Sequence, residues 1–99
     1  MPRQPNMSSQ TRALLGALLA APEVWRHGFP LARETGLASG TLYPLLARLE
    51  SQEFLEARWL PPEAPGRPAR HAYRLTAKGR ALARERAAPA TAALKARPA

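Results

Sequence analysis

Groups that bind phosphate well gather in one stretch of this sequence, residues 38–50. Ser39 and Thr41 supply hydroxyls at the expected start of a helix, where backbone N–H groups also lack intrahelical partners. Tyr43 and Arg48 lie further along and add donors that can reach phosphate oxygens or base edges. These residue types therefore predict a helix that contacts nucleic acid through its first turns.

The leucines of this stretch predict a separate, buried face of the same helix. They are spaced three, one and three residues apart, which aligns them on one side: Leu42, Leu45, Leu46 and Leu49. The other side chains point elsewhere: Thr41, Tyr43, Pro44, Ala47 and Arg48. One face is expected in a core, and the other is free to meet a ligand as large as a duplex.

Pro44 constrains where this helix begins, because a proline deep in a helix removes a hydrogen bond and costs about 3 kcal/mol. If Thr41 is the N-cap, Pro44 lies in the first turn and no bond is lost. If Ser39 is the N-cap instead, one bond is lost. Both alternatives predict a slightly irregular helix start with exposed N–H groups that suit phosphate oxygens.

A shorter helix is expected directly before this one. It covers Phe29 or Pro30 to Thr35, and Gly36 is well placed as its C-terminal cap. Leu37 then packs inward as the chain turns into the next helix. A short helix, a tight turn containing glycine and a longer helix with an exposed polar face form the helix-turn-helix arrangement.

After residue 54 the apolar period changes from helical to two, which predicts two strands of a hairpin around residues 55–59 and 71–75. Between them, the loop of residues 60–70 contains four prolines and one glycine, too many for a helix or a strand. Arg67 and Arg70 lie near its tip and its base. Such a loop is a wing that can lie along a phosphate backbone or enter a minor groove.

The two outermost helices are expected to enclose this unit. Ser8 or Ser9 can cap a first helix that runs to about Ala20, and Thr76 can cap a last helix that runs to about Ala88. The last helix has one large apolar residue and a row of basic ones, of which Lys78 at its start is best placed for the DNA backbone. The basic residues are Lys78, Arg80, Arg84 and Arg86.

Length and composition favour one small domain that gains from a second copy. The chain has 99 residues and no cysteine, so it buries about two thirds or less of its unfolded surface and has no disulfide. Oligomerisation is the natural expectation. We expect a flexible tail over residues 1–7, a winged helix-turn-helix domain over residues 8–88, and a short Ala/Pro-rich tail over residues 89–99.

The charge of +8, from 15 basic and 7 acidic residues, predicts an anionic partner. Nucleic acid is favoured over membrane because no basic helix has a broad, bulky apolar face. The alternative explanation of this charge is that the richness in alanine and arginine only reflects genomic base composition. No apolar run approaches the roughly 18 residues that span a bilayer, so we expect a cytoplasmic protein without a membrane partner.

The sequence does not predict an enzyme, a cofactor or a metal site. It has no nucleophile elbow, no glycine loop for phosphates, no Asp and no clustered carboxylates. His27 and His71 stand alone, without nearby cysteine or aspartate. Trp25 and Trp59 have two interpretations, packing in the core or at a dimer interface, and stacking on a planar ligand.

Several short motifs resemble the winged-helix domain of PadR-type bacterial transcription regulators over roughly residues 10–86. The matching pieces are Ser39-Gly40-Thr41-Leu42-Tyr43-Pro44-Leu45-Leu46, Arg48-Leu49-Glu50, Gly66-Arg67-Pro68, Tyr73-Arg74-Leu75-Thr76 and Gly79-Arg80. The resemblance implies a mainly α fold with a small β-hairpin, a winged helix-turn-helix that dimerises through its first and last helices. It also implies a homodimer on a palindromic operator of double-stranded DNA, usually as a repressor.

Two features depart from the family pattern. The usual His-Gly-Tyr of the second helix stands here as His27-Gly28-Phe29. Longer members have a helical C-terminal domain for dimerisation and effector binding, whereas this sequence resembles the short form. A small aromatic effector, such as those that stack on aromatic residues in this family, is a further expected partner.

The expected DNA-binding residues are Ser39, Gly40, Thr41, Tyr43, Pro44, Arg48, Arg67, Arg70 and Lys78.

Some of these residues also have a structural interpretation. Tyr43 can be a half-buried packing residue whose hydroxyl reaches water. Arg48 can pair with a surface carboxylate such as Glu34 or Glu53. The two wing arginines can simply keep the loop soluble. Two functional alternatives remain beside the transcription regulator: a protein-interaction module on the same scaffold, and a protein that coats nucleic acid without sequence preference.

Overall fold

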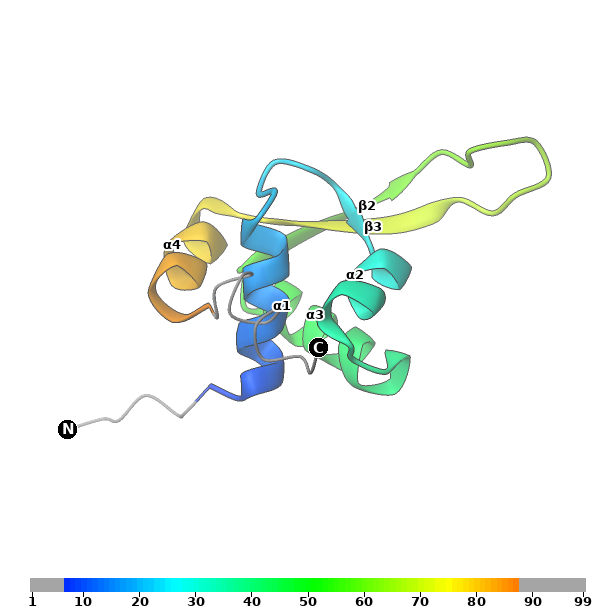
Figure 1. Ribbon diagram of the computed structural model, residues 1–99. Coiled ribbons are helices and arrows are strands. Elements are labelled where there is room, and N and C mark those ends of the chain that lie inside the picture. The colour runs from blue at the N-terminus through cyan, green and yellow to red at the C-terminus, as the bar shows by residue number, and fades with distance from the viewer. Residues whose placement is uncertain (1–6, 88–99) are drawn as a thin grey trace.

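Four helices and three strands make up the computed structural model, which describes residues 7–87 (Figure 1). Their bounds are α1 Ser9–Leu19, β1 Arg26–His27, α2 Gly28–Thr35, α3 Ser39–Ser51, β2 Leu55–Leu60, β3 Arg70–Leu75 and α4 Ala77–Arg86. The fold is a winged helix-turn-helix, as the sequence predicts. The two expected tails, residues 1–7 and 89–99, lie outside the described residues apart from Met7.

Hydroxyl side chains cap the two outer helices as predicted. The Ser8 hydroxyl accepts a hydrogen bond from the Thr11 N–H at 3.1 Å. The Thr76 hydroxyl accepts one from the Gly79 N–H at 2.9 Å. Each cap satisfies a backbone donor that the helix itself leaves without a partner.

The sheet has three antiparallel strands in the order β1-β3-β2, one strand more than the sequence predicts. The additional strand, β1, pairs Arg26 with Tyr73 and His27 with Ala72. Two residues carry no alternation pattern, so only the partner strand makes this segment extended. The hairpin is also longer than predicted, because Leu60 and Arg70 face each other as a strand pair instead of belonging to the loop.

The core lies between one face of this sheet and the helices. Figure 1 shows α1, α2 and α3 on one side of the strands, with the hairpin β2–β3 extending beyond them. The predicted leucine stripes of α1 and α3 lie in this core, although Leu19 and Leu45 are only partly buried. The buried members are Leu14, Leu15, Leu18, Leu31, Leu42, Leu46, Leu49, Leu55, Tyr73, Leu75 and Ala83.

The last helix docks at the end of the sheet opposite to the wing loop (Figure 1). Gly79 permits this close approach, because a Cβ there would lie 2.8 Å from the Phe54 carbonyl carbon. The Arg12 guanidinium of α1 donates to the Arg86 carbonyl of α4 at 2.9 Å. The first and last helices therefore pack on each other within one chain.

Candidate nucleic-acid interface

The turn between α2 and α3 is built around Gly36. This residue ends α2 in the left-handed conformation, with φ of 75°, and donates its N–H to the Ala32 carbonyl at 2.8 Å. Glycine adopts this conformation without the steric cost that other residues pay. Leu37 follows and packs partly buried against the core, so the predicted helix-turn-helix is confirmed.

The start of α3 differs from both predicted alternatives. The N-cap is Ala38, not Ser39 or Thr41, and no side chain forms a capping hydrogen bond. The helix therefore begins at Ser39, one residue earlier than a Ser39 cap and three residues earlier than a Thr41 cap would give. Pro44 is the sixth residue of α3, so the Gly40 carbonyl lacks the N–H donor that residue 44 would otherwise supply.

This uncapped start is exposed to solvent. Ala38, Ser39 and Gly40 are all exposed, and the first intrahelical hydrogen bonds come from the N–H groups of Thr41 and Leu42 to the Ala38 carbonyl. The N–H groups of Ser39 and Gly40 therefore have no partner within the helix. Two backbone donors, the positive end of the helix dipole and the Ser39 hydroxyl lie together there and suit an anionic oxygen.

Tyr43 is held beside this start by a glycine. The residue is 46% exposed, and the hydroxyl edge of its ring lies against Gly28, where a Cβ would come within 2.6 Å of the Tyr43 Cζ. This edge of the ring packs against α2, and the contact of Tyr43 with DNA stays a prediction. The absence of a side chain at position 28 is the feature that fixes the ring, and the sequence gives no sign of it.

The polar face of α3 continues with exposed side chains of Pro44, Ala47 and Arg48. Glu34, one of the expected partners of Arg48, forms an ion pair with Arg26 instead. The Arg26 guanidinium also donates to the Ala17 carbonyl at 3.2 Å, which ties β1 to α1. Arg48 is therefore left on the solvent-facing side of the helix.

The wing loop, residues 61–69, is exposed throughout. It turns at Gly66, which has φ of 83°, and the Arg67 N–H donates to the Ala64 carbonyl at 3.1 Å. Arg70, at the base of the loop, forms an ion pair with Glu63 at 3.0 Å. Arg67 at the tip extends into solvent, so the two predicted wing arginines have different surroundings.

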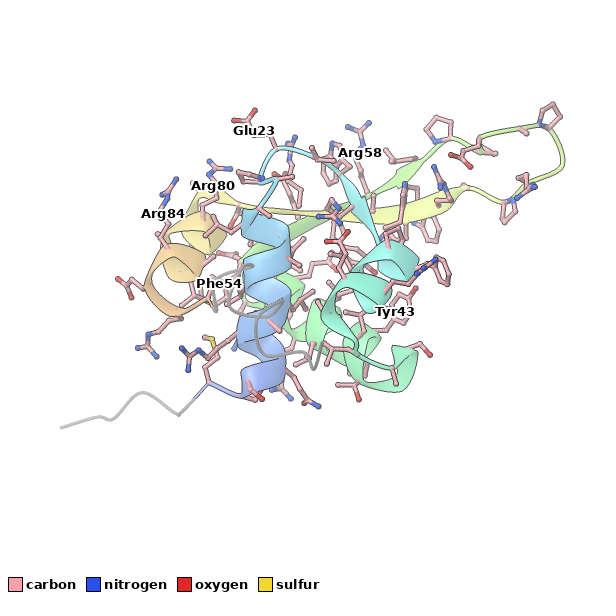
Figure 2. The ribbon with its side chains drawn as sticks, viewed as in Figure 1. Glu23, Tyr43, Phe54, Arg58, Arg80 and Arg84 are labelled. Atoms are coloured by element: carbon pink, nitrogen blue, oxygen red, sulfur yellow. The ribbon has the colours of Figure 1, made fainter. Side chains whose placement is uncertain are left out.

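The structure brings most of the predicted residues to one side of the molecule. Figure 2 shows Tyr43 on the side from which the wing extends, and Arg80 and Arg84 on the opposite side, on α4. Lys78 is separated from the others, because its ammonium donates to the Gln52 carbonyl at 3.2 Å, beyond the C-terminal end of α3. That helix has 13 residues and places about 20 Å between Gln52 and Ser39.

The two tryptophans lie outside the buried core. Trp25 contacts two arginines, with the Arg58 guanidinium 5.3 Å and the Arg74 guanidinium 4.3 Å from its ring centre. Trp59 is 65% exposed, so packing in the core is the wrong interpretation for this residue. Its ring stacks on His71. The alternation of the two strands could have indicated that Trp59 and His71 share a face of the hairpin, but not that Trp59 is exposed.

Among residues 7–87, none of the helices combines the length and the apolar character of a membrane-spanning segment. The same residues contain no group of three side chains that could hold a metal ion.

A search for related proteins identifies the family. The sequence profile of the transcriptional regulator PadR-like family matches residues 26–85, which cover the elements from β1 to α4. The chain belongs to the PadR-like family of transcriptional regulators. No curated protein sequence gave a match.

Solved structures of regulators share the fold of this PadR-like protein. A PadR-like transcription factor from Bacteroides fragilis is 28% identical with a TM-score of 0.59, and each chain is covered to 77%. The PcaV regulator from Streptomyces coelicolor, solved with its natural ligand, is 24% identical with a TM-score of 0.65. The alignment covers 84% of this chain but only 55% of PcaV. MepR from S. aureus, in its DNA-binding conformation, is 18% identical with a TM-score of 0.66, and the alignment covers 91% of this chain and 60% of MepR.

Proposed function

We propose that this PadR-like regulator binds double-stranded DNA sequence-specifically, with α3 in the major groove and the wing on the flanking backbone or minor groove. The observation that carries the proposal is the open start of α3, where Ser39 and Gly40 are exposed and no side chain caps the helix. Thr41, Tyr43, Pro44 and Arg48 are the other proposed contacts on this helix. Helix N-termini bind phosphate through such donors, while side chains further along reach base edges.

The wing supplies the second part of the proposed contact. Its loop holds four prolines, which limit its freedom, and presents Arg67 at the tip. An arginine on a stiff loop binds phosphates or enters a narrow minor groove at a low cost in conformational entropy. Arg70 and Lys78 remain proposed contacts, although each is engaged with a group of the protein itself.

A homodimer on a palindromic operator is the proposed arrangement. Two α3 helices related by a two-fold axis would enter successive major grooves about 34 Å apart. The small core of one chain favours a dimer, and α1 with α4 offers a paired helical surface for it, away from the wing. Occupation of the operator by such a dimer would repress transcription in the cytoplasm.

A small aromatic effector is proposed as the means of control. PcaV, which shares the fold, was solved with its natural ligand. A ligand that binds the dimer more tightly when α4 has one orientation would favour that orientation. The distance between the two α3 helices would then change, and the affinity for the operator would change with it.

Selection of bound DNA tests the proposed function. Purified protein is mixed with fragments of its own genome at moderate salt with excess competitor, and the bound pool is sequenced. Enrichment of an inverted repeat supports a dimeric site-specific regulator. A pool without sequence preference indicates a coating protein, and the absence of bound DNA at low salt indicates a protein partner instead.

A further inference from the structure

A cluster of three aromatic side chains connects the wing to the region of α3. Trp59 of β2 stacks on His71 of β3, with ring centres 4.5 Å apart and planes inclined by 15°. The two residues are direct partners in the β2–β3 register, so the strands themselves hold the rings together. Although 65% of Trp59 is exposed, its orientation is therefore fixed.

The cluster is anchored in the core at its other end. The His71 and Tyr73 ring centres are 4.8 Å apart, and His71 Nδ1 and the Tyr73 hydroxyl share a hydrogen bond of 3.1 Å. Burial raises the pKa of Tyr73 above its ordinary value of 10.0, and the neighbouring Tyr43 and Glu50 raise it further. Tyr73 thus keeps its hydroxyl proton, and it lies close enough to Tyr43 and Glu50 of α3 to interact with them electrostatically.

Charge indicates what could cover the exposed end of this cluster. Arg67 lies on the loop between the two strands, whereas Arg58 and Arg70, which are next in sequence to Trp59 and His71, lie on the other face of the hairpin. The acidic residue of that loop, Glu63, is already paired with Arg70. An anionic ligand is therefore favoured over a neutral one, and the indole N–H of Trp59 can donate to it.

We propose that Trp59 and His71 form a further contact surface for duplex DNA, which binds the sugar-phosphate backbone between the α3 and wing contacts. This inference rests on the proposed DNA-binding function and deepens it. The cluster is continuous with the interface, since it begins in the wing hairpin and ends at Tyr73 beside Tyr43. The stacked His71 ring keeps the indole in place, so little rotamer freedom is lost when DNA binds.

Fluorescence of Trp59 tests the contact directly. In W25F, Trp59 is the single tryptophan, and the duplex enriched in the selection experiment is added while acrylamide quenching is measured. We expect bound DNA to lower the quenching constant at least about twofold, because the duplex covers the exposed ring face. An unchanged constant at saturating DNA, with binding followed by the anisotropy of labelled duplex, would overturn the inference.

Affinity measurements give the second readout. W59A should weaken duplex binding about tenfold, as expected for the loss of a hydrogen bond to a charged group. The matched control is V24A, which removes an apolar residue 53% exposed in the segment before β1 and should leave the affinity unchanged. Thermal unfolding checks that both variants fold.

The outcomes separate this inference from the proposed function. If the wild-type protein does not bind any duplex, both fail together. If the wild type binds and R67A weakens it while W59A does not, only the aromatic contact is refuted. If W59A abolishes binding of the planar dye 8-anilinonaphthalene-1-sulfonate but retains DNA affinity, the cluster is an effector site and the inference is wrong.

Discussion

The first turns of α3 and α4 differ in how they are capped. In α4, the Thr76 hydroxyl accepts the Gly79 N–H and donates to the Glu53 carbonyl at 2.7 Å. In α3, the N-cap is Ala38, which has no polar side chain, and the Thr41 N–H bonds to the Ala38 carbonyl instead. A capping side chain adds stability and occupies the helix start, whereas a start without one leaves that place to an anionic ligand.

The side chains around these two helix starts show the same difference. Lys78 donates to the Gln52 carbonyl and lies 4.9 Å from the centre of the Phe54 ring, so its charge joins α4 to the end of α3. At the start of α3, Ser39 is exposed and Gly40 has open space around it. The comparison teaches that basic residues alone do not locate a DNA-binding helix, because internal partners decide which donors remain available.

The largest expected effect distinguishes the two glycines. G79A should destabilise the protein by about 3 kcal/mol, because the new Cβ would lie 2.8 Å from the Phe54 carbonyl carbon and 3.1 Å from Leu75 Cδ2. G40A is the matched control and should raise stability by about 0.5 kcal/mol, since nothing lies within 4 Å and alanine favours a helix. Urea unfolding at 25 °C measures both, and equal losses would contradict the comparison.

Filling the open helix start should affect binding next most strongly. A38D supplies the missing cap and should stabilise the fold by about 1 kcal/mol, while its carboxylate should lower duplex affinity at least about tenfold. A81D is the control, because Ala81 is exposed on α4 and the charge change is identical. If A81D weakens binding as much as A38D, net charge and not the helix start governs the interaction.

Removing the cap of α4 should affect stability and leave binding unchanged. T76A loses a capping bond and should cost about 1 kcal/mol, which corresponds to a fall in Tm of about 4–8 °C for a domain of this size. Folded T76A should bind DNA with wild-type affinity. A clear loss of affinity in protein that circular dichroism shows to be folded would mean that the Thr76 side chain itself contributes to DNA binding.

The smallest expected effect belongs to the wing tip. R67A should weaken binding to all duplexes about fivefold and reduce the slope of log affinity against log salt by about 1, as expected for one lost phosphate contact. R84A is the control, on the side of the molecule away from Tyr43 (Figure 2). Identical salt slopes for wild type and R67A would remove the wing tip from the mechanism.

Local signals explain why much of the fold could be predicted. Ser8, Thr76 and Gly36 act within a few residues of their position in the chain, and their capping roles follow from the sequence. The leucine spacing of α1 and α3 similarly reports a helical face directly. These features together predict the helix-turn-helix and the hairpin that carry the candidate site.

Features that depend on distant partners could not be predicted in this way. β1 exists because β3 offers a free edge, and Tyr43 takes its position because Gly28 of another helix leaves space for the ring. The alternation of β2 places Trp59 on the same face as the core residue Leu55, but Trp59 lies beyond the end of the core and is exposed. The cap of α3 was predicted wrongly. Hydroxyl side chains cap well only at the N-cap position, and that position is taken by Ala38, not by Ser39 or Thr41.

Amide resonances would compare the two helix starts in one experiment. Nitrogen-15-labelled protein is titrated with the duplex enriched from the genome, and the ¹H–¹⁵N signals are followed to saturation. The account predicts large shifts for Ser39 and Gly40, whose N–H groups would acquire phosphate partners, and small shifts for Gly79 and Arg80, whose N–H groups are already bonded to Thr76. Large shifts at Gly79 and Arg80 with unmoved signals for Ser39 and Gly40 would contradict it.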